Sequence, residues 1–573
     1  MFWLVVFCCL YTVILCNNDG SRLVHLSQGP VRGYKDPDEG IFSFYGIPYA
    51  KAPTGPERFK APLPAPVWSD TFEAVDKGIV CPQSNLMGIL PPSNVPQEDC
   101  LIANVYVPDT NKTNLPVLII VHGGAYAMGW GNMFTPKKVT STKKVISVTF
   151  NYRLGPHGFL CLGTKDAPGN AGMKDQVALF RWVKKNIRSF GGNPDDIILS
   201  GFSSGASAID ILILSKMTKG YFKKIIPESA GGLSPFNVQL DPIENAKIYA
   251  KLLKFDNVDD IEALENFYKT VPYELLNSGN VMALKNSGTV MAPCVERDIG
   301  EERFLDDSPV NILKSGDFEK LPTLYGFVDM DGLFRLPQFY HWKNEMNDYF
   351  ADFLPVDLQF TNEYEKQKVA EQIKHFYFGD KLVGEETVLN YIYYFSDVLF
   401  AWPMLRSVKY QVEAGHDQIY LYQYSYFEDN APFIPYTNVR GADHCAQTYG
   451  TLDGYWNNTI VGEKDVSEDI RQRKIYMKKI WLNFILTGKP IPEGSGLPEW
   501  PPVSFDLSPH MSINRTLELK GSLLKERRLF WEKIYDKYYR YPIPPVLPTD
   551  YKHLNDGKAR AINYSKLLNE TGK

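Results

Sequence analysis

The chain has no excess of basic residues and, beyond its N-terminus, no long apolar run. Its 61 Lys and Arg are outnumbered by 66 Asp and Glu, which gives a formal net charge of −5 at pH 7. Nucleic-acid-binding proteins carry a clustered basic surface, so we expect no nucleic-acid partner. The short basic run at 524–533 carries apolar residues at helical spacing and is interpreted as the exposed face of a helix. With 573 residues and 44% hydrophobic content, the chain is long enough for one large α/β domain or for two to three smaller ones.

The one long apolar run extends from Phe2 to Cys16 and gives way abruptly to polar residues. It is too short to span a bilayer and has the length of a signal-peptide core. We therefore predict that residues 1–16 are a signal peptide and that the protein is secreted. Residues 541–573 begin with a proline-rich segment and end in a polar tail, which we expect to be mobile and to carry no membrane or lipid anchor.

Cysteine is scarce, with 8 residues in the chain. Three of them, Cys8, Cys9 and Cys16, would leave with the signal peptide. Cys81 and Cys100 close a loop rich in proline and turn residues, where a disulfide would stabilise the fold by roughly 3 kcal/mol. An odd number remains, so at least one thiol is free. The pairing of these three stays open: Cys161, Cys294 and Cys445.

Asn-x-Ser/Thr triplets are candidate glycosylation sites in a secreted protein, although each is common by chance. They begin at Asn111, Asn457, Asn514, Asn563 and Asn569. Together with the predicted signal peptide, they favour an extracellular location.

Apolar runs that alternate with helical patterns indicate the fold class. Buried strands are predicted at 116–124, 144–155, 196–201, 223–229, 321–332 and 418–426, and short β segments within 22–50. Helices are predicted at 173–187 and 204–216, and helical patterns dominate 242–400. This alternation favours an α/β fold with a mostly parallel sheet covered by helices on both faces. We predict one domain over residues 17–540, with helical insertions over the top of the sheet.

The pentapeptide Gly-Phe-Ser-Ser-Gly at 201–205 lies between a predicted strand and a predicted helix. A Gly-x-Ser-x-Gly motif in this context is typical of a nucleophilic serine held on a sharp turn. The glycines are needed because a side chain at Gly201 or Gly205 would collide with the neighbouring strand or helix. The alternative is a glycine-rich turn in which Ser203 only caps the helix.

A second motif, Val-His-Gly-Gly-Ala at 121–125, follows another predicted buried strand. Small residues let the backbone approach a substrate, so the N–H groups of Gly124 and Ala125 are candidate donors to an oxyanion, with the N–H of Ser204 as the third. A simple turn at the end of a strand is the alternative. We interpret His122, which precedes the glycines, as structural.

These segments resemble type-B carboxylesterases of the α/β-hydrolase fold, the family that contains cholinesterases and insect carboxylesterases. The resemblance covers about residues 22–540 and is closest in pattern to insect carboxylesterases. It rests on the serine signature at 190–208, the cysteine signature at 98–108, and the segments 151–160 and 169–187. It implies an α/β-hydrolase fold with a gorge under the helical insertions and a disulfide between Cys81 and Cys100.

The resemblance also implies the partners of the serine. The family's acid lies in a Gly-x-x-x-x-Glu-Gly pattern, and here residues 326–332 place Asp331 at that position, so that an aspartate replaces the usual glutamate. Asp329 is a nearby rival. The family's base lies in a Gly-x-x-His pattern, which places His444 within 441–450. His444 would then take the proton of Ser203, and Asp331 would orient the imidazole.

Several positions depart from the family pattern. Phe202, directly before the serine, stands where cholinesterases and many carboxylesterases carry an acidic residue, which makes a cationic substrate less favourable than a neutral one. Ser204 replaces the usual alanine but leaves the backbone donor intact. Residues 445–447, Cys-Ala-Gln, replace a commonly acidic stretch. Ile102 and Ala103 replace an aromatic and a bulky aliphatic residue, which affects packing only.

We therefore predict a secreted serine esterase that hydrolyses neutral, apolar carboxylic esters through an acyl-enzyme, without a metal or a cofactor. Its expected partner is a small-molecule ester, and its oligomeric state stays open. Two alternatives remain: a non-catalytic cholinesterase-like adhesion or binding protein, and a carrier that sequesters esters.

Overall fold

The computed structural model describes residues 20–84, 88, 90–277, 284–427, 431–456, 459–460 and 468–547. The predicted signal peptide at 1–16 and most of the predicted tail at 541–573 lie outside the described residues. Among the sequons, Asn111 and Asn514 are exposed, whereas Asn457, Asn563 and Asn569 are outside the described part of the chain. The described ranges contain no helix whose length and apolar content would let it cross a membrane.

The centre of the molecule is a sheet of 13 strands within the described residues. Its strands are β1 Ser21–Leu26, β2 Gly29–Asp36, β3 Ile41–Pro48, β4 Phe72–Glu73, β7 Ile102–Pro108, β8 Leu115–Val121, β10 Ile146–Phe150, β11 Gly192–Phe202, β12 Lys224–Glu228, β13 Thr323–Val328, β14 Ile419–Tyr424, β17 His510–Ile513 and β18 Leu517–Lys520. Two small sheets are separate from it: one pairs β5 Ile79–Val80 with β6 Val95–Pro96, and the other has three strands, with β15 Asp453–Trp456 between β9 Phe134–Thr135 and β16 Thr459–Ile460.

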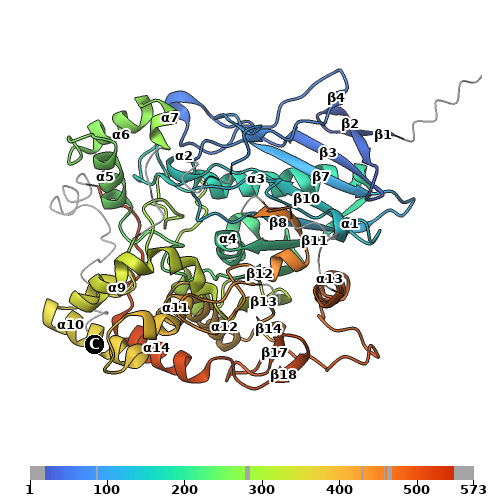
Figure 1. Cartoon of the computed structure of the whole chain (residues 1–573). Coiled ribbons are helices and arrows are strands. Elements are labelled where there is room, and N and C mark those ends of the chain that lie inside the picture. The colour runs from blue at the N-terminus through green and yellow to red at the C-terminus, as the bar shows by residue number, and fades with distance from the viewer. Residues whose placement is uncertain are drawn as a thin grey trace, which may run out of the picture.

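The strand order is β1-β2-β3-β7-β10-β8-β11-β12-β13-β14-β17-β18, and from β2 onward the labels follow this order from top to bottom in Figure 1. In this order every neighbouring pair from β10 to β17 is parallel, while antiparallel pairs form both margins of the sheet. The predicted mostly parallel sheet is therefore confirmed. The sequence did not predict β7, β17 and β18. In β7 the polar residue Asn104 interrupts the apolar run, and β17 and β18 have only 4 residues each.

The helices are α1 Lys137–Thr140, α2 Gly155–Phe159, α3 Ala171–Asn186, α4 Ser204–Leu212, α5 Pro242–Leu252, α6 Ile261–Thr270, α7 Tyr273–Leu276, α8 Pro309–Ser315, α9 Phe339–Asp348, α10 Glu363–Phe378, α11 Val388–Ser396, α12 Trp402–Glu413, α13 Glu468–Thr487 and α14 Lys525–Tyr538. Helices α5, α6, α7, α9 and α10 lie on the left of Figure 1, beyond the strand ends. These are the helical insertions that the segment 242–400 predicts.

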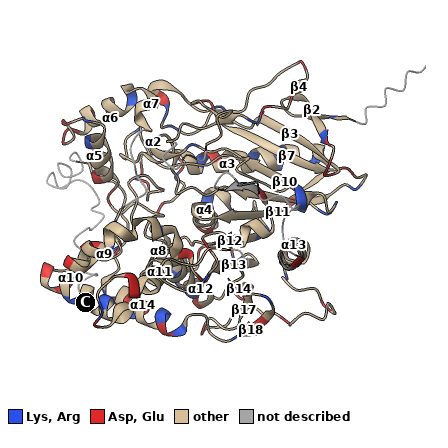
Figure 2. Cartoon of the chain, viewed as in Figure 1, with Lys and Arg blue, Asp and Glu red and all other residues tan. Residues whose placement is uncertain are grey.

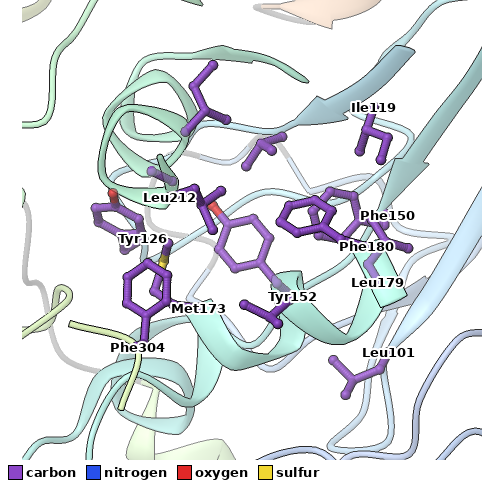
Figure 3. Packing of buried hydrophobic residues seen from close by; sticks show 14 of the residues in the cluster. Leu101, Ile119, Tyr126, Phe150, Tyr152, Met173, Leu179, Phe180, Leu212 and Phe304 are labelled. Atoms are coloured by element: carbon purple, nitrogen blue, oxygen red, sulfur yellow. The ribbon is translucent and has the colours of Figure 1, made fainter. Parts of the chain in front are cut away.

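Helices cover both faces of the parallel strands, and the side chains of β8 show this directly. Val117, Ile119 and Val121 belong to the same buried cluster as residues of α3 and α4, whereas Leu118 and Ile120 belong to a second cluster with residues of α13. Successive strand residues point to opposite faces, so a strand buried on both sides is apolar throughout. Figure 3 shows the first cluster, where residues of α3 lie against β8 and β10.

Charged residues of both signs are interspersed along the outer helices, while the central strands are mostly free of colour in Figure 2. This distribution agrees with the apolar strands that the sequence predicts. Because burial of an unpaired charge is costly, each ionisable group in this charge-poor interior needs hydrogen-bonding or charged partners.

Candidate active site

Ser203 occupies the junction of β11 and α4, with φ 55° and ψ −131°. This positive φ is unusual for a residue with a side chain and is enriched at functional sites. The two glycines of the motif allow it. A Cβ on Gly201 would lie 2.5 Å from the carbonyl oxygen of Gly205, and one on Gly205 would lie 2.2 Å from that of Val121. The turn therefore requires glycine at both positions.

His444 lies between Ser203 and Asp331. Its Nε2 is 3.0 Å from the Oγ of Ser203, and its Nδ1 is 2.7 Å from Oδ1 of Asp331. The second carboxylate oxygen of Asp331 accepts a hydrogen bond from the backbone N–H of Val328, at 3.2 Å. Ser203 follows β11, Asp331 follows β13, and His444 follows β14 along the chain. Three segments distant in sequence therefore meet at the carboxyl ends of these strands.

Asp329, the sequence rival of Asp331, has a different partner. Its Oδ1 accepts a hydrogen bond from the backbone N–H of Ala442, at 3.1 Å. Burial raises the pKa of Asp329 to about 6. Asp329 therefore supports the segment that precedes His444, whereas Asp331 is the carboxylate that is hydrogen-bonded to the imidazole.

The environment of His444 favours its protonated form. Burial disfavours the charged imidazolium, but the hydrogen bond to Asp331 and the charge of its carboxylate oppose burial and raise the pKa of His444. Burial also raises the pKa of the Cys445 thiol, so this thiol is neutral near pH 7. The carboxylate of Asp331 is therefore the anion that stabilises the imidazolium.

The glycine loop after β8 lies beside the serine. A Cβ on Gly123 would lie 2.9 Å from the Cβ of Ser203, and one on Gly124, whose φ is 112°, would lie 2.1 Å from the carbonyl oxygen of Met128. Ala125 also has a positive φ of 53°. Ser204 Oγ accepts a hydrogen bond from the backbone N–H of the next loop residue, Tyr126, at 3.3 Å. The side chain of Ser204 thus ties this loop to α4.

His122 is buried at the base of this loop. Its ring stacks on Tyr152 with a centroid distance of 4.4 Å, and burial lowers its pKa to about 4. A Cβ on Gly129 would lie 2.3 Å from its Nδ1. These contacts make His122 a neutral packing residue.

Ser203, His444, Gly124 and Ala125 line a cavity of about 830 Å³, a figure that includes its open mouth. The other lining residues are mostly apolar: Met128, Met133, Phe134, Phe202, Phe236, Gly288, Thr289, Phe334, Arg335, Leu399, Phe400, Cys445 and Tyr449. Of the described lining residues, none is acidic. Ser204 does not line the cavity with its side chain, which is fully buried.

Aromatic rings surround the imidazole and the serine. The ring centroid of Phe400 is 4.4 Å from that of His444, and Phe334 lies at 5.4 Å. Phe202 packs edge-on against Phe134 at 4.8 Å. Most of these lining residues could not be predicted from the sequence, because they come from separate strands, loops and insertions and share no local pattern. Only the density of aromatics within 339–353 and 391–404 was a signal.

The cysteines form two disulfides within the described residues. Cys81 is bonded to Cys100, the pairing that the sequence predicts, and Cys161 is bonded to Cys294, a pairing that the sequence left open. Cys445 is the free cysteine of the described chain and is buried. The described residues contain no group of three or more His, Cys, Asp and Glu side chains that could hold a metal ion.

Known proteins share the sequence and the fold of this chain. The family model described as "Carboxylesterase family" matches residues 20–531. The chain is 31% identical to juvenile hormone esterase of Heliothis virescens (84% of this chain, 88% of the relative) and 31% identical to esterase FE4 of Myzus persicae (86% and 88%). The crystal structure of juvenile hormone esterase from Manduca sexta, with OTFP covalently attached, superposes with a TM-score of 0.80 at 28% identity, over 90% of this chain and 100% of that chain.

The family model covers nearly the whole described region, and the fold matches that of a solved relative. The chain therefore belongs to the carboxylesterase family, with an α/β-hydrolase fold, and is a serine hydrolase of carboxylic esters.

Proposed function

We propose that the protein hydrolyses neutral, apolar carboxylic esters through an acyl-enzyme, with Ser203 as nucleophile, His444 as base and Asp331 as the acid that orients it. The observation that carries this proposal is the continuous hydrogen-bonded series from Asp331 through His444 to Ser203 at the wall of an apolar cavity.

The geometry supports the following sequence of steps. The Oγ of Ser203 attacks the ester carbonyl carbon while Nε2 of His444 takes its proton. The carbonyl oxygen becomes an oxyanion, which the backbone N–H groups of Gly124, Ala125 and Ser204 stabilise. Each such donor contributes on the order of 3 kcal/mol to the transition state. His444 then gives the proton to the departing alcohol, and a water molecule, activated in the same way, releases the acid.

The carboxylate of Asp331 has two tasks in these steps. By accepting from Nδ1 of His444 it fixes the tautomer that leaves Nε2 free to accept a proton. It also stabilises the imidazolium that forms when Ser203 attacks. Its own orientation is held by the backbone N–H of Val328.

The cavity supports a neutral, apolar substrate. Its described walls are largely aromatic and aliphatic, and Phe202 presents a ring directly before Ser203. A quaternary ammonium substrate would find no acidic side chain among the described lining residues. Two relatives carry the name of an insect hormone, juvenile hormone, in their own names, so this ester belongs in a substrate screen.

We also propose that the protein is secreted. Two disulfides support an oxidising compartment. The exposed sequons at Asn111 and Asn514 are accessible to glycosylation. The single-domain organisation over 17–540 and the signal peptide at 1–16 remain part of this proposal.

Hydrolysis of nitrophenyl and alkyl esters of graded chain length tests the proposal. We expect turnover of neutral esters by the native chain, loss of turnover in Ser203→Ala, and turnover close to native in Ser207→Ala. Ser207 is a matched control because it is a buried serine of α4, the helix that follows Ser203, and its Oγ donates to the carbonyl oxygen of Gly231. Folded native protein that binds these esters without cleaving them would favour the carrier, and failure to bind them would favour the adhesion protein.

A further inference from the structure

Glu228 is a buried carboxylate beside the proposed active site that has no part in the steps above. It is the last residue of β12, with 1% of its surface exposed, and it does not line the cavity. Burial of a charged group is costly unless hydrogen bonds compensate for the lost water. The partners of Glu228 therefore indicate why a carboxylate is present there.

Three side chains from three different segments donate to this carboxylate. Oε1 accepts from the hydroxyl of Tyr422 in β14 at 2.5 Å and from Nε1 of Trp481 in α13 at 3.2 Å. Oε2 accepts from Oγ1 of Thr448 at 2.7 Å. Burial raises the pKa of Glu228 to about 7, and the three donors oppose this rise. Both carboxylate oxygens of Glu228 therefore act as acceptors toward these three side chains.

Thr448 connects Glu228 to the segment that carries the imidazole. Its backbone N–H donates to the carbonyl oxygen of Cys445, the residue directly after His444, at 2.9 Å. The intervening Gln447 donates from Nε2 to the Oγ of Ser229, next to Glu228, at 2.9 Å. The turn that follows His444 is therefore anchored to the end of β12 by two adjacent side-chain contacts.

The main chain of Glu228 is bonded to the nucleophile as well. Its carbonyl oxygen accepts a hydrogen bond from the backbone N–H of Ser203, at 2.9 Å. Through one residue, the backbone of Ser203 and the turn after His444 are both tied to the same strand end. These ties act alongside the contacts that Asp331 and Asp329 make with His444 and with the segment before it.

We propose that Glu228 is a positioning residue that holds the turn after His444 at the distance from Ser203 that proton transfer requires. This inference rests on the proposed function, because it assumes that His444 is the base for Ser203. Proton transfer needs a contact within hydrogen-bond reach, and a displacement of about 1 Å can cost about a hundredfold in rate. Since Glu228 does not line the cavity, its loss should lower kcat and leave KM unchanged.

The most direct test removes the donor on the His444 turn. Thr448→Val keeps the shape of the side chain and removes its hydroxyl, and Thr448→Ser keeps the hydroxyl. We expect kcat for a nitrophenyl ester to fall about tenfold or more in Thr448→Val, with KM within about twofold, and to return to within about threefold of native in Thr448→Ser.

A second pair of variants separates positioning from general stability. Glu228→Gln replaces two acceptor oxygens by one oxygen and an amide that donates, so we expect the same loss of kcat as in Thr448→Val. Tyr422→Phe removes a donor from Oε1, which keeps the bond from Trp481. Tyr422→Phe should therefore lower the melting temperature and keep kcat within about threefold of native. The double variant of Glu228→Gln and Thr448→Val should lose no more than the larger single loss, because both break one contact.

Each rate is divided by the number of active sites, measured as the serines that react with an organophosphate. Unfolded protein then does not lower the kcat that is calculated. If native protein is not labelled and does not turn over esters, the proposed function is wrong. If native protein is labelled and active but Thr448→Val and Glu228→Gln both keep kcat within twofold per titrated site, the positioning role alone is overturned. Equal losses of kcat in Tyr422→Phe and Thr448→Val would also overturn it, because they would indicate a purely structural network.

Discussion

Nε2 of His444 lies 3.0 Å from the Oγ of Ser203, although 241 positions separate the two residues in the chain. Neither residue reaches the other through a local turn. Ser203 is held by the end of β11, and His444 follows β14, three strands away in the sheet order. The proposed chemistry therefore depends on the packing of the whole sheet, and its parts can be tested one residue at a time.

The two carboxylates at 329 and 331 should behave differently when each is neutralised. Asp331→Asn should lower kcat by about 10⁴-fold, because an amide can hold the wrong tautomer of His444. Asp329→Asn is the matched control: it should keep most of the activity, since Asp329 bonds to the N–H of Ala442. The kcat of each variant with a nitrophenyl ester tests this difference, and equal losses of kcat in both variants would contradict the assignment of Asp331.

The pH dependence of kcat/KM should report His444. The imidazole accepts the proton of Ser203 only when it is neutral, and its pKa is raised well above the usual value of 6.5. The rate should therefore fall on acidification, with a midpoint above pH 6.5. In Asp331→Asn the anion that stabilises the imidazolium is lost, so the residual activity should show a midpoint at lower pH. A profile that does not change between the two proteins would contradict this origin of the shift.

Two glycines provide a matched test of the turn at Ser203. A Cβ on Gly205 would lie 2.2 Å from a backbone oxygen of β8, whereas Gly384 has no atom within 4 Å of its Cβ position and has an extended φ of −169°. Gly205→Ala should destabilise the fold by about 3 kcal/mol or more and abolish hydrolysis, and Gly384→Ala should do neither. Urea unfolding measures the stability of each variant, and ester hydrolysis measures its activity. A stable, active Gly205→Ala would show that the close approach is not needed.

The ring of Phe202 should determine how the cavity responds to substrate charge. Phe202→Glu adds a carboxylate next to Ser203, and Phe202→Gln adds a similar shape without charge. The ratio of kcat/KM for a choline ester to that for its neutral 3,3-dimethylbutyl isostere should rise at least about fivefold in the Glu variant relative to the Gln variant, equivalent to roughly 1 kcal/mol of charge attraction. An unchanged ratio would mean that this position does not face the alcohol group.

The local parts of this molecule could be predicted from the sequence. The turn at 201–205 has its own signature, because Ser203 is flanked by glycines between an apolar strand and a helix. The apolar run of β8 predicts that strand to within a few residues, whereas β11 begins at Gly192, four positions before the predicted strand, because its first residues are mostly polar. The positions of Asp331 and His444 came from a resemblance to a family, not from any local physical pattern.

The parts that depend on distant contacts could not be predicted. Glu228 lies near the end of a predicted strand, and the residues around it in the sequence do not indicate that Thr448, Tyr422 and Trp481 donate hydrogen bonds to it. The pairing of Cys161 with Cys294 spans 133 positions and has no local signal. The cavity wall could not be predicted either. Phe334 and Phe400 lie beside the imidazole only because the inserted helices fold back over the sheet.

The most direct measurement of the central claim is the position of a covalent organophosphate adduct on the folded protein. A phosphorus electrophile reacts with a serine only where a base activates it and an oxyanion site receives the developing charge. We expect one adduct per chain, located on Ser203 by peptide mass spectrometry and absent in His444→Ala. An adduct on another residue, or folded native protein that stays unlabelled, would contradict it.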